Sequence, residues 1–168
     1  EPILRMLDAL PHLNVLCPSN GADTAPLMRA AIEHQGVTVV LEPTSVLGSS
    51  GGHAGPPAIG EARCIAEGDH VTIVAWGVGV DAAQTAARTL DREGISAEII
   101  DLRSLAPVDI DRLSASVHKT GRLIVVGANT AILNQAVTAA FLRLESPPAT
   151  VNATPESITT EARAAVHY

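Results

Sequence analysis

The clearest pattern of apolar and polar positions runs over residues 71–107. Residues 71–75 form a short apolar run rich in β-branched side chains, which predicts a strand covered on both faces. A tight turn over 76–79 follows, and Asp81 is placed to cap the next helix. Small and apolar side chains recur along one stripe of that helix, at Ala83, Ala86, Ala87 and Leu90.

This helix leads into a second strand. Gly94 stands where a helix ends in a left-handed residue, and residues 95–100 form an apolar strand closed by Asp101. Two strands joined through a helix usually run parallel with a right-handed crossover. The pattern therefore predicts a βαβ unit and an α/β fold with a mostly parallel sheet and helices on both faces.

The alternation continues toward the C-terminus. Asp109 is expected to cap a helix that Gly121 ends, and residues 122–126 read as a third strand. Residues 149–153 predict a fourth strand and 157–166 a terminal helix.

Another helix is expected between the third and fourth strands. It begins at Asn129 or Thr130 and is stopped by Pro147 and Pro148. Its apolar stripe is expected to comprise Leu133, Ala136, Val137, Ala140, Phe141 and Leu144.

Upstream of residue 45 the pattern predicts a smaller α/β unit. A short helix over 2–10 precedes a strand over 14–16, Asp23 is expected to cap a helix that ends at Gly36, and 37–41 forms a strand. This unit is too small to stand alone and resembles the end of a domain.

Gly, Ser and Pro dominate the stretch between the two units. We therefore expect a domain remnant over residues 1–44, a linker over 45–64 and a second domain over 65–168.

Composition and charge narrow the classes of function. The chain carries a formal net charge of −7 and shows no basic stripe, so we expect no nucleic-acid partner. No apolar run reaches the roughly 18 residues of a membrane span, and the start lacks a basic head and a cleavage site. Cys17 and Cys64 have no metal-type spacing, which favours reduced thiols in a cytoplasmic protein.

A glycine motif raises the possibility of nucleotide binding. Gly77, Gly79 and Ala82 form G-x-G-x-x-A between a strand and a helix, and Asp101 ends the next strand. That is the context of a dinucleotide-binding fingerprint, with the pyrophosphate at the helix start and the acid on a ribose hydroxyl. Any βαβ turn also favours glycine, so the residues alone leave both interpretations open.

The remaining candidates carry weaker signals. The six histidines are scattered, and His53 lies in the linker, where it could be either a mobile active-site residue or an ordinary linker residue. Asp101, Arg103 and Asp109 cluster around a sharp turn with Pro107, and we expect a structural turn, a salt bridge or a subunit contact there.

Several longer segments resemble one family. EGDHVTIVAWG (67–77), GISAEIIDLRSLAPVD (94–109) and KTGRLIVV (119–126) resemble the β subunit of the thiamine diphosphate-dependent 2-oxo acid dehydrogenases of the pyruvate and branched-chain type. PHLNVLCPSN (11–20) and LEP (41–43) resemble the close of that family's pyrimidine-binding domain. The resemblance implies a transketolase C-terminal domain preceded by the tail of a pyrimidine-binding domain, and it makes dinucleotide binding the lesser alternative.

The resemblance also implies partners and a cofactor. In the full assembly, thiamine diphosphate and Mg²⁺ would sit between α-type and β-type subunits, decarboxylate a 2-oxo acid and pass the acyl group to a lipoyl arm. This chain would contribute scaffold, contacts with an α-type and a second β-type subunit, and a surface able to dock the acyltransferase core. It would hold no cofactor alone.

The sequence departs from the family pattern near the expected cofactor cleft. The family's glutamate that protonates the cofactor, and the histidine of the same domain, would precede residue 1. Gly127 and Ala128 occupy the place of a His-Glu pair and a glycine-rich loop. The chain is therefore expected to carry no catalytic, cofactor-binding or metal-ligating residue, and a non-catalytic docking relative is an open alternative.

Overall fold

The computed structural model of the chain describes residues 6–7, 10, 12–46, 58–127 and 129–168. Two parts follow from this division, which we call the first unit (12–46) and the second unit (58–127 and 129–168). Of the helix expected over 2–10, Met6 and Leu7 are helical and most of the rest lies outside the described residues. His53 and most of the expected linker also lie outside them.

The second unit is built on a five-stranded sheet with the order β3-β5-β4-β7-β8. The last four of these strands run parallel, and β3 pairs antiparallel with β5 at one edge. This confirms the predicted mostly parallel α/β sheet. The strands are β3 (Arg63–Ala66), β4 (Val71–Ala75), β5 (Ala97–Asp101), β7 (Leu123–Val126) and β8 (Ala149–Val151).

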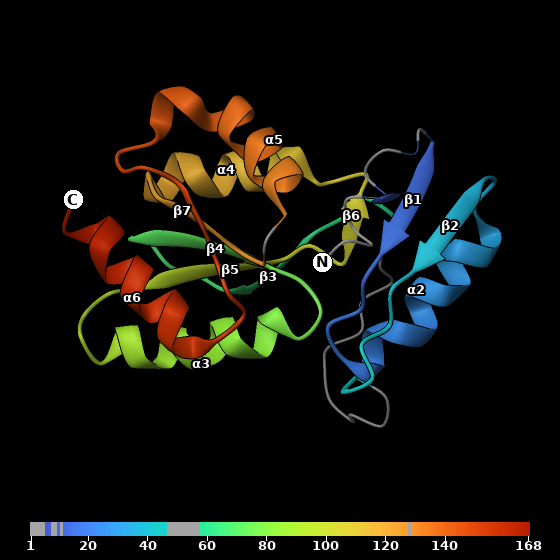
Figure 1. The fold of residues 1–168 in the computed structure, drawn as a ribbon, viewed down its shortest axis with the longest axis horizontal. Coiled ribbons are helices and arrows are strands. Elements are labelled where there is room, and N and C mark those ends of the chain that lie inside the picture. The colour runs from blue at the N-terminus through green and yellow to red at the C-terminus, as the bar shows by residue number, and fades with distance from the viewer. Residues whose placement is uncertain (1–5, 8–9, 11, 47–57, 128) are drawn as a thin grey trace.

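Helices cover both faces of this sheet (Figure 1). On one face, α3 (Gly79–Asp91) and α6 (Pro155–Val166) pack on side chains such as Ile73 and Ile124. On the other face, α4 (Ile110–Thr120) and α5 (Thr130–Ala140) pack on side chains such as Val74 and Val125. Each face thus has its own apolar core, and every residue of β4 is buried between them, as its unbroken apolar run predicts.

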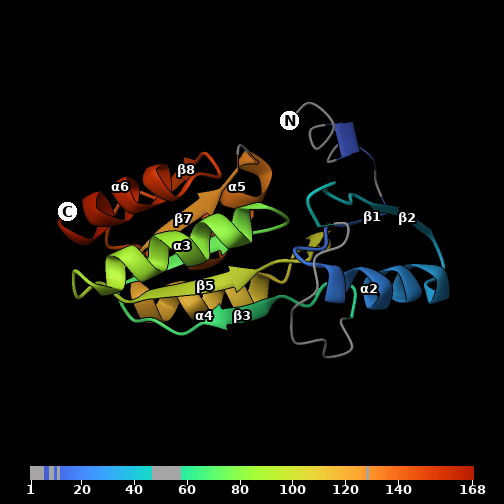
Figure 2. The same cartoon turned by 90° about the horizontal axis from the view of Figure 1, so that it is seen from below.

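The first unit lies at one end of the molecule (Figure 2). It contains β1 (Leu13–Leu16), α2 (Gly21–Glu33) and β2 (Val37–Val40), with β1 and β2 parallel. Its sheet has the order β2-β1-β6, and β6 (Ser104–Ala106) comes from the second unit and runs antiparallel to β1. The strand expected over 37–41 is confirmed, and the downstream chain completes the sheet.

One of the three predicted helix caps is confirmed, at Asp109, and so is the helix start predicted at Asn129 or Thr130. The Asp109 carboxylate accepts from Arg112 N at 3.0 Å at the start of α4, and the Asn129 side chain accepts from Ala131 N at 2.9 Å at the start of α5. Gly121 ends α4 with φ +70°, in the left-handed region.

The caps predicted at Asp23 and Asp81 are wrong. Asn20 caps α2 by accepting from Asp23 N at 3.1 Å, and its amide donates to Asp23 Oδ2 at 2.6 Å, so Asp23 lies in the first turn of the helix. Asp81 lies in the first turn of α3, which starts after Val78, and no side chain among the described residues caps that helix. In both cases the helix begins two or more residues earlier than the acidic residue suggested.

The apolar stripe predicted for α5 is wrong at Phe141. Ala136 and Ala140 are buried as expected, but the α-helix ends at Ala140 and continues as a 3-10 turn, Phe141–Arg143. The tighter winding of that turn changes the side-chain period, so the Phe141 side chain is 68% exposed.

Candidate functional site

The segment from Asp101 to Asp109 connects the two units. Asp101 ends β5, and the chain then leaves the five-stranded sheet, forms β6 beside β1 and returns to that sheet at α4. Arg103 adopts φ +53°, and its carbonyl accepts from Cys17 N of the first unit at 2.8 Å. At this turn the backbones of the two units are therefore hydrogen-bonded to each other.

A buried charged cluster lies beside this turn. The guanidinium of Arg63, the first residue of β3, donates to both oxygens of Asp23 on α2, at 3.1 and 2.7 Å, and to Asp101 Oδ2 at 3.2 Å. The Ser19 hydroxyl donates to Asp101 Oδ2 at 2.5 Å. Both carboxylate side chains have no exposed surface, and the Arg63 side chain is 19% exposed. We call Ser19, Asp23, Arg63 and Asp101 the Arg63 cluster.

Arg103 and Asp109, which the sequence also singled out, bond to the backbone of residues 61–62. The Arg103 guanidinium donates to Glu61 O at 3.2 Å, and the Asp109 carboxylate accepts from Ala62 N at 2.9 Å. Pro107 O accepts from the Ser104 hydroxyl at 2.7 Å. The structure thus divides the expected charged group in two, with Asp101 in the Arg63 cluster and Arg103 and Asp109 on residues 61–62.

Burial shifts the pKa values of several groups in the region where the two units meet, which we call the junction. Burial raises the pKa of Asp101, while the Ser19 hydroxyl and the charge of Arg63 oppose the rise. Burial also lowers the pKa of Arg103, and the nearby charge of Arg63 adds to that effect. Burial, with the Asp101 charge beside it, raises the pKa of the Cys17 thiol to about 12, so this thiol is not a nucleophile near neutral pH.

The glycine turn after β4 is covered by the first unit. Gly77 has φ +52°, and a Cβ there would lie 3.0 Å from Cys17 Sγ and 3.2 Å from Pro43 Cγ. A Cβ on Gly79 would lie 3.1 Å from Val126 Cγ1. These glycines therefore allow close contact between protein segments, and Gly77 faces protein where a pyrophosphate would need access.

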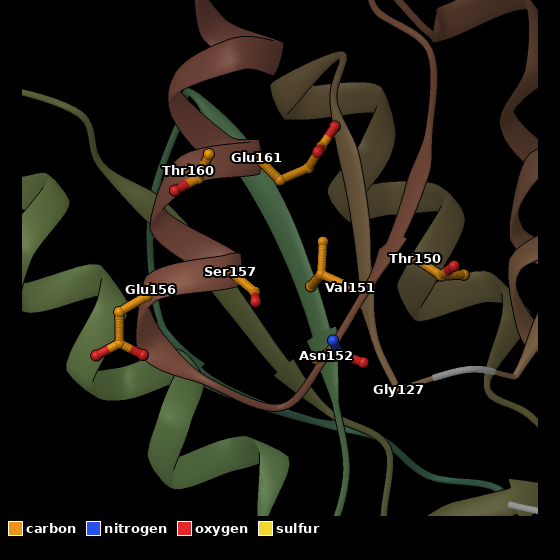
Figure 3. A pocket seen from close by; sticks show the side chains of 8 residues that line it. All are labelled: Gly127, Thr150, Val151, Asn152, Glu156, Ser157, Thr160 and Glu161. Atoms are coloured by element: carbon orange, nitrogen blue, oxygen red, sulfur yellow. The ribbon is translucent and has the colours of Figure 1, made fainter.

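A polar hollow of about 490 Å³ lies at the carboxyl ends of β7 and β8, beside the start of α6 (Figure 3). Ligands of open parallel sheets commonly bind at this edge. Hydroxyls, an amide and two carboxylates line it, and none of its described lining residues is basic. They are Gly127, Thr150, Val151, Asn152, Glu156, Ser157, Thr160 and Glu161.

The comparisons with known proteins agree with this architecture. Residues 60–167 match the family model described as the transketolase C-terminal domain. The chain belongs to this family. It is 42% identical over 122 residues to the β subunit of acetoin:2,6-dichlorophenolindophenol oxidoreductase of Cupriavidus necator, an alignment that covers 70% of this chain and 36% of that protein.

Other relatives in the comparison are pyruvate dehydrogenase E1 β subunits. That of Acholeplasma laidlawii is 34% identical over 161 residues, covering 88% of this chain and 49% of the relative. The mitochondrial one of Caenorhabditis elegans is 39% identical over 123 residues, covering 69% and 35%. The chain thus spans between a third and a half of the length of these relatives.

Solved structures show the same fold. A split-gene transketolase described as an inactive β4 tetramer superposes with a TM-score of 0.80 at 23% identity, covering 98% of this chain and 61% of that one. Transketolase of Pichia stipitis in complex with sedoheptulose 7-phosphate superposes with a TM-score of 0.69 at 18% identity, covering 98% and 26%. The transketolase-type fold expected from the sequence is confirmed.

The polar hollow does not fit the cofactor that this family implies. Thiamine diphosphate carries a polyanionic group, and the carboxylates of Glu156 and Glu161 would repel it without a basic side chain from the described lining to offset them. The described residues that line this hollow therefore do not build a diphosphate site on their own.

A second cluster with metal-ligand chemistry is already paired with a lysine. Cys64, Glu67 and Glu98 bring ligand atoms within 4.8 Å of one another. The Lys119 ammonium ion-pairs with Glu67 at 3.0 Å and with Glu98, and these bonds raise the pKa of Lys119. We read the cluster as a structural ion-pair network. Sequence patterns do not reveal this network, because its members come from separate segments.

None of the helices in the described part of the chain is both long and apolar enough to cross a membrane. Cys17 and Cys64 are free thiols.

Proposed function

We propose that the chain forms part of the β-type subunit of a thiamine diphosphate-dependent 2-oxo acid dehydrogenase. The match of residues 60–167 to the transketolase C-terminal domain, together with relatives named as β subunits, carries the proposal. In this assignment residues 1–44 are the end of a pyrimidine-binding domain, 45–64 a linker and 65–168 the C-terminal domain. The assembly is cytoplasmic and contains an α-type subunit and a second β-type subunit.

The role of this chain in the assembly is scaffold and subunit contact. The assembly would decarboxylate a 2-oxo acid oxidatively and transfer the acyl group to a lipoyl arm, with thiamine diphosphate and Mg²⁺ supplying the electron sink. The acidic lining of the hollow, which would repel a diphosphate, and the high pKa of Cys17 support a scaffold role for the described residues. The turn around Asp101, Arg103, Pro107 and Asp109 is proposed as a structural turn beside a subunit contact, and the second unit as a surface that docks the acyltransferase core.

The proposal is tested by co-expression with an α-type subunit. We expect the two proteins to co-purify and to release carbon dioxide from a 2-oxo acid when thiamine diphosphate and Mg²⁺ are added. Each protein alone is the control. An inactive pair that lacks bound cofactor would count against an enzymatic role.

The second candidate is a docking relative that keeps the fold without the chemistry. Gly127, at the place where the family has a longer loop, opens directly onto the acidic hollow, which favours this alternative. It predicts a stable complex with the α-type subunit and no calorimetric response to thiamine diphosphate and Mg²⁺. A thermal shift with a dinucleotide that Gly79→Val weakens would instead favour a nucleotide-binding domain.

A further inference from the structure

We propose that the ion pairs of the Arg63 cluster hold the first unit packed against the second, and that the two units separate when the positive charge of Arg63 is removed. We call this arrangement the latch, and the packed state of the two units the closed form. Ser19 and Asp23 belong to the first unit, while Arg63 and Asp101 belong to the second. The positive charge of Arg63 lies between two carboxylates from different units and bonds to both. The inference does not depend on the proposed function, because it follows from the contacts of this chain alone.

Removing the charge of Arg63 leaves two buried carboxylates facing each other across the junction. The Ser19 hydroxyl spans them, at 2.5 Å from Asp101 and 3.5 Å from Asp23. Breaking a buried ion pair by deleting one partner is costly, because the remaining charges lose both solvent and counter-ion. Since the two acids lie on different units, separating the units hydrates both and relieves the repulsion.

The other titratable groups at the junction do not replace Arg63. Arg103 faces Asp101 and Asp23 at longer range, and its guanidinium donates to Glu61 O. The Cys17 thiol is neutral, since its pKa is raised to about 12, and Glu61 adds another negative group. The bonded cation of the described cluster is therefore Arg63.

The first unit depends on this latch because its own core is small. Within residues 12–46, the described apolar side chains that are buried are Val15, Leu16, Cys17, Leu27 and Val46. A two-stranded sheet with one helix is marginal without support from neighbouring structure. Opening of the junction is therefore expected to release the first unit as one cooperative segment, while the five-stranded sheet stays folded.

Hydrogen exchange followed by mass spectrometry tests the latch on the intact chain. In Arg63→Met we expect exchange of residues 13–40 to accelerate about a hundredfold or more, the factor that corresponds to loss of a buried ion pair, with β4 and β7 unchanged. Arg163→Met is the control, because Arg163 forms an exposed bidentate pair with Glu93 on the second unit. It should leave exchange of residues 13–40 unchanged.

Two further measurements separate charge from packing. The double variant Arg63→Met/Asp101→Asn removes one of the facing charges and should recover most of the protection that Arg63→Met loses. In Arg63→Met the pKa of Asp101, which burial already raises, loses the opposing effect of the Arg63 charge, so protonation of Asp101 favours the closed form. After correction for intrinsic exchange, protection should be greater at pH 6 than at pH 8 and should fall as pH rises.

The outcomes decide the proposal in either direction. Recovery in the double variant together with acid-restored protection supports the latch. If Arg63→Met leaves exchange of residues 13–40 as in the native chain, or if the double variant is no better protected than Arg63→Met and protection shows no pH dependence, the latch is refuted. If Arg63→Met does not fold at all, a folded and protected double variant still supports the proposal, and a double variant that is equally unfolded overturns it.

Discussion

Gly68→Ala tests how the chain crosses from β3 to β4. These strands are not neighbours, because β5 lies between them, so the connecting loop must pass over the start of β5. Gly68 is buried at this crossing, and a Cβ there would lie 2.3 Å from Ala97 C and 2.5 Å from Glu98 N. Both are backbone atoms of β5, which cannot rotate away as a side chain can.

The loop cannot move outward without losing hydrogen bonds. Asp69 N donates to Ser96 Oγ at 3.0 Å, and His70 N donates to Ser96 O at 3.1 Å. Overpacking costs about 1–3 kcal/mol, and each lost hydrogen bond adds about 1 kcal/mol. We expect Gly68→Ala to lower the free energy of unfolding by about 3 kcal/mol, which corresponds to a Tm about 6–12 °C lower in a chain of this size.

Gly94→Ala is the matched control. Gly94 has φ +78° with no atom within 4 Å of an added Cβ, so the substitution carries only the left-handed backbone cost of about 1–2 kcal/mol. Thermal unfolding followed by circular dichroism compares the two variants. A Gly68→Ala variant no less stable than Gly94→Ala would refute the reasoning from the crossing geometry.

The remaining predictions concern the second unit. Thr72→Val removes a buried hydroxyl that bonds to two hydroxyls of α4 at 2.8 and 2.7 Å. Urea unfolding should show a free energy of unfolding lower by about 1–3 kcal/mol, and an unchanged value would contradict this prediction. Lys119 lowers the pKa of Glu67, so ionised Glu67 stabilises the fold above its unfolded pKa, and this stabilisation is lost as pH falls. Lys119→Met should therefore flatten the acid limb of a curve of stability against pH, and it leaves Glu98 unpaired. An acid limb that does not change would contradict this prediction. Asn129→Ala should cost about 1 kcal/mol in the same urea assay through loss of the α5 cap, and a neutral effect would argue against the cap.

The sequence predicts the parallel sheet well because its signals are local. The apolar run at 71–75, the helical stripe ending at Leu90 and the Asp109 cap each depend on residues close together in the chain, and each is confirmed. β3 and β6 were not predicted, because they are short and are fixed by pairing with β5 and β1. Their formation depends on tertiary contacts that periodicity does not record.

The Arg63 cluster shows why the candidate site could be predicted only in part from the sequence. The sequence singles out Asp101 as an acid at the end of a strand, but its cation, Arg63, lies in the expected linker, and the helix pattern assigns Asp23 to a cap. The glycine motif at 77–82 fits either a pyrophosphate or a close protein contact. The packing of Gly77 on Cys17 and Pro43 distinguishes the two, and only the folded chain brings these residues together.

Native mass spectrometry with thiamine diphosphate and Mg²⁺ present tests whether this chain is part of a β-type subunit, because it measures the mass of the assembly that the chain forms with an α-type subunit. We expect a complex that contains both kinds of subunit in equal number together with bound cofactor. A chain that stays separate from the α-type subunit and instead gains the mass of an added dinucleotide would contradict it.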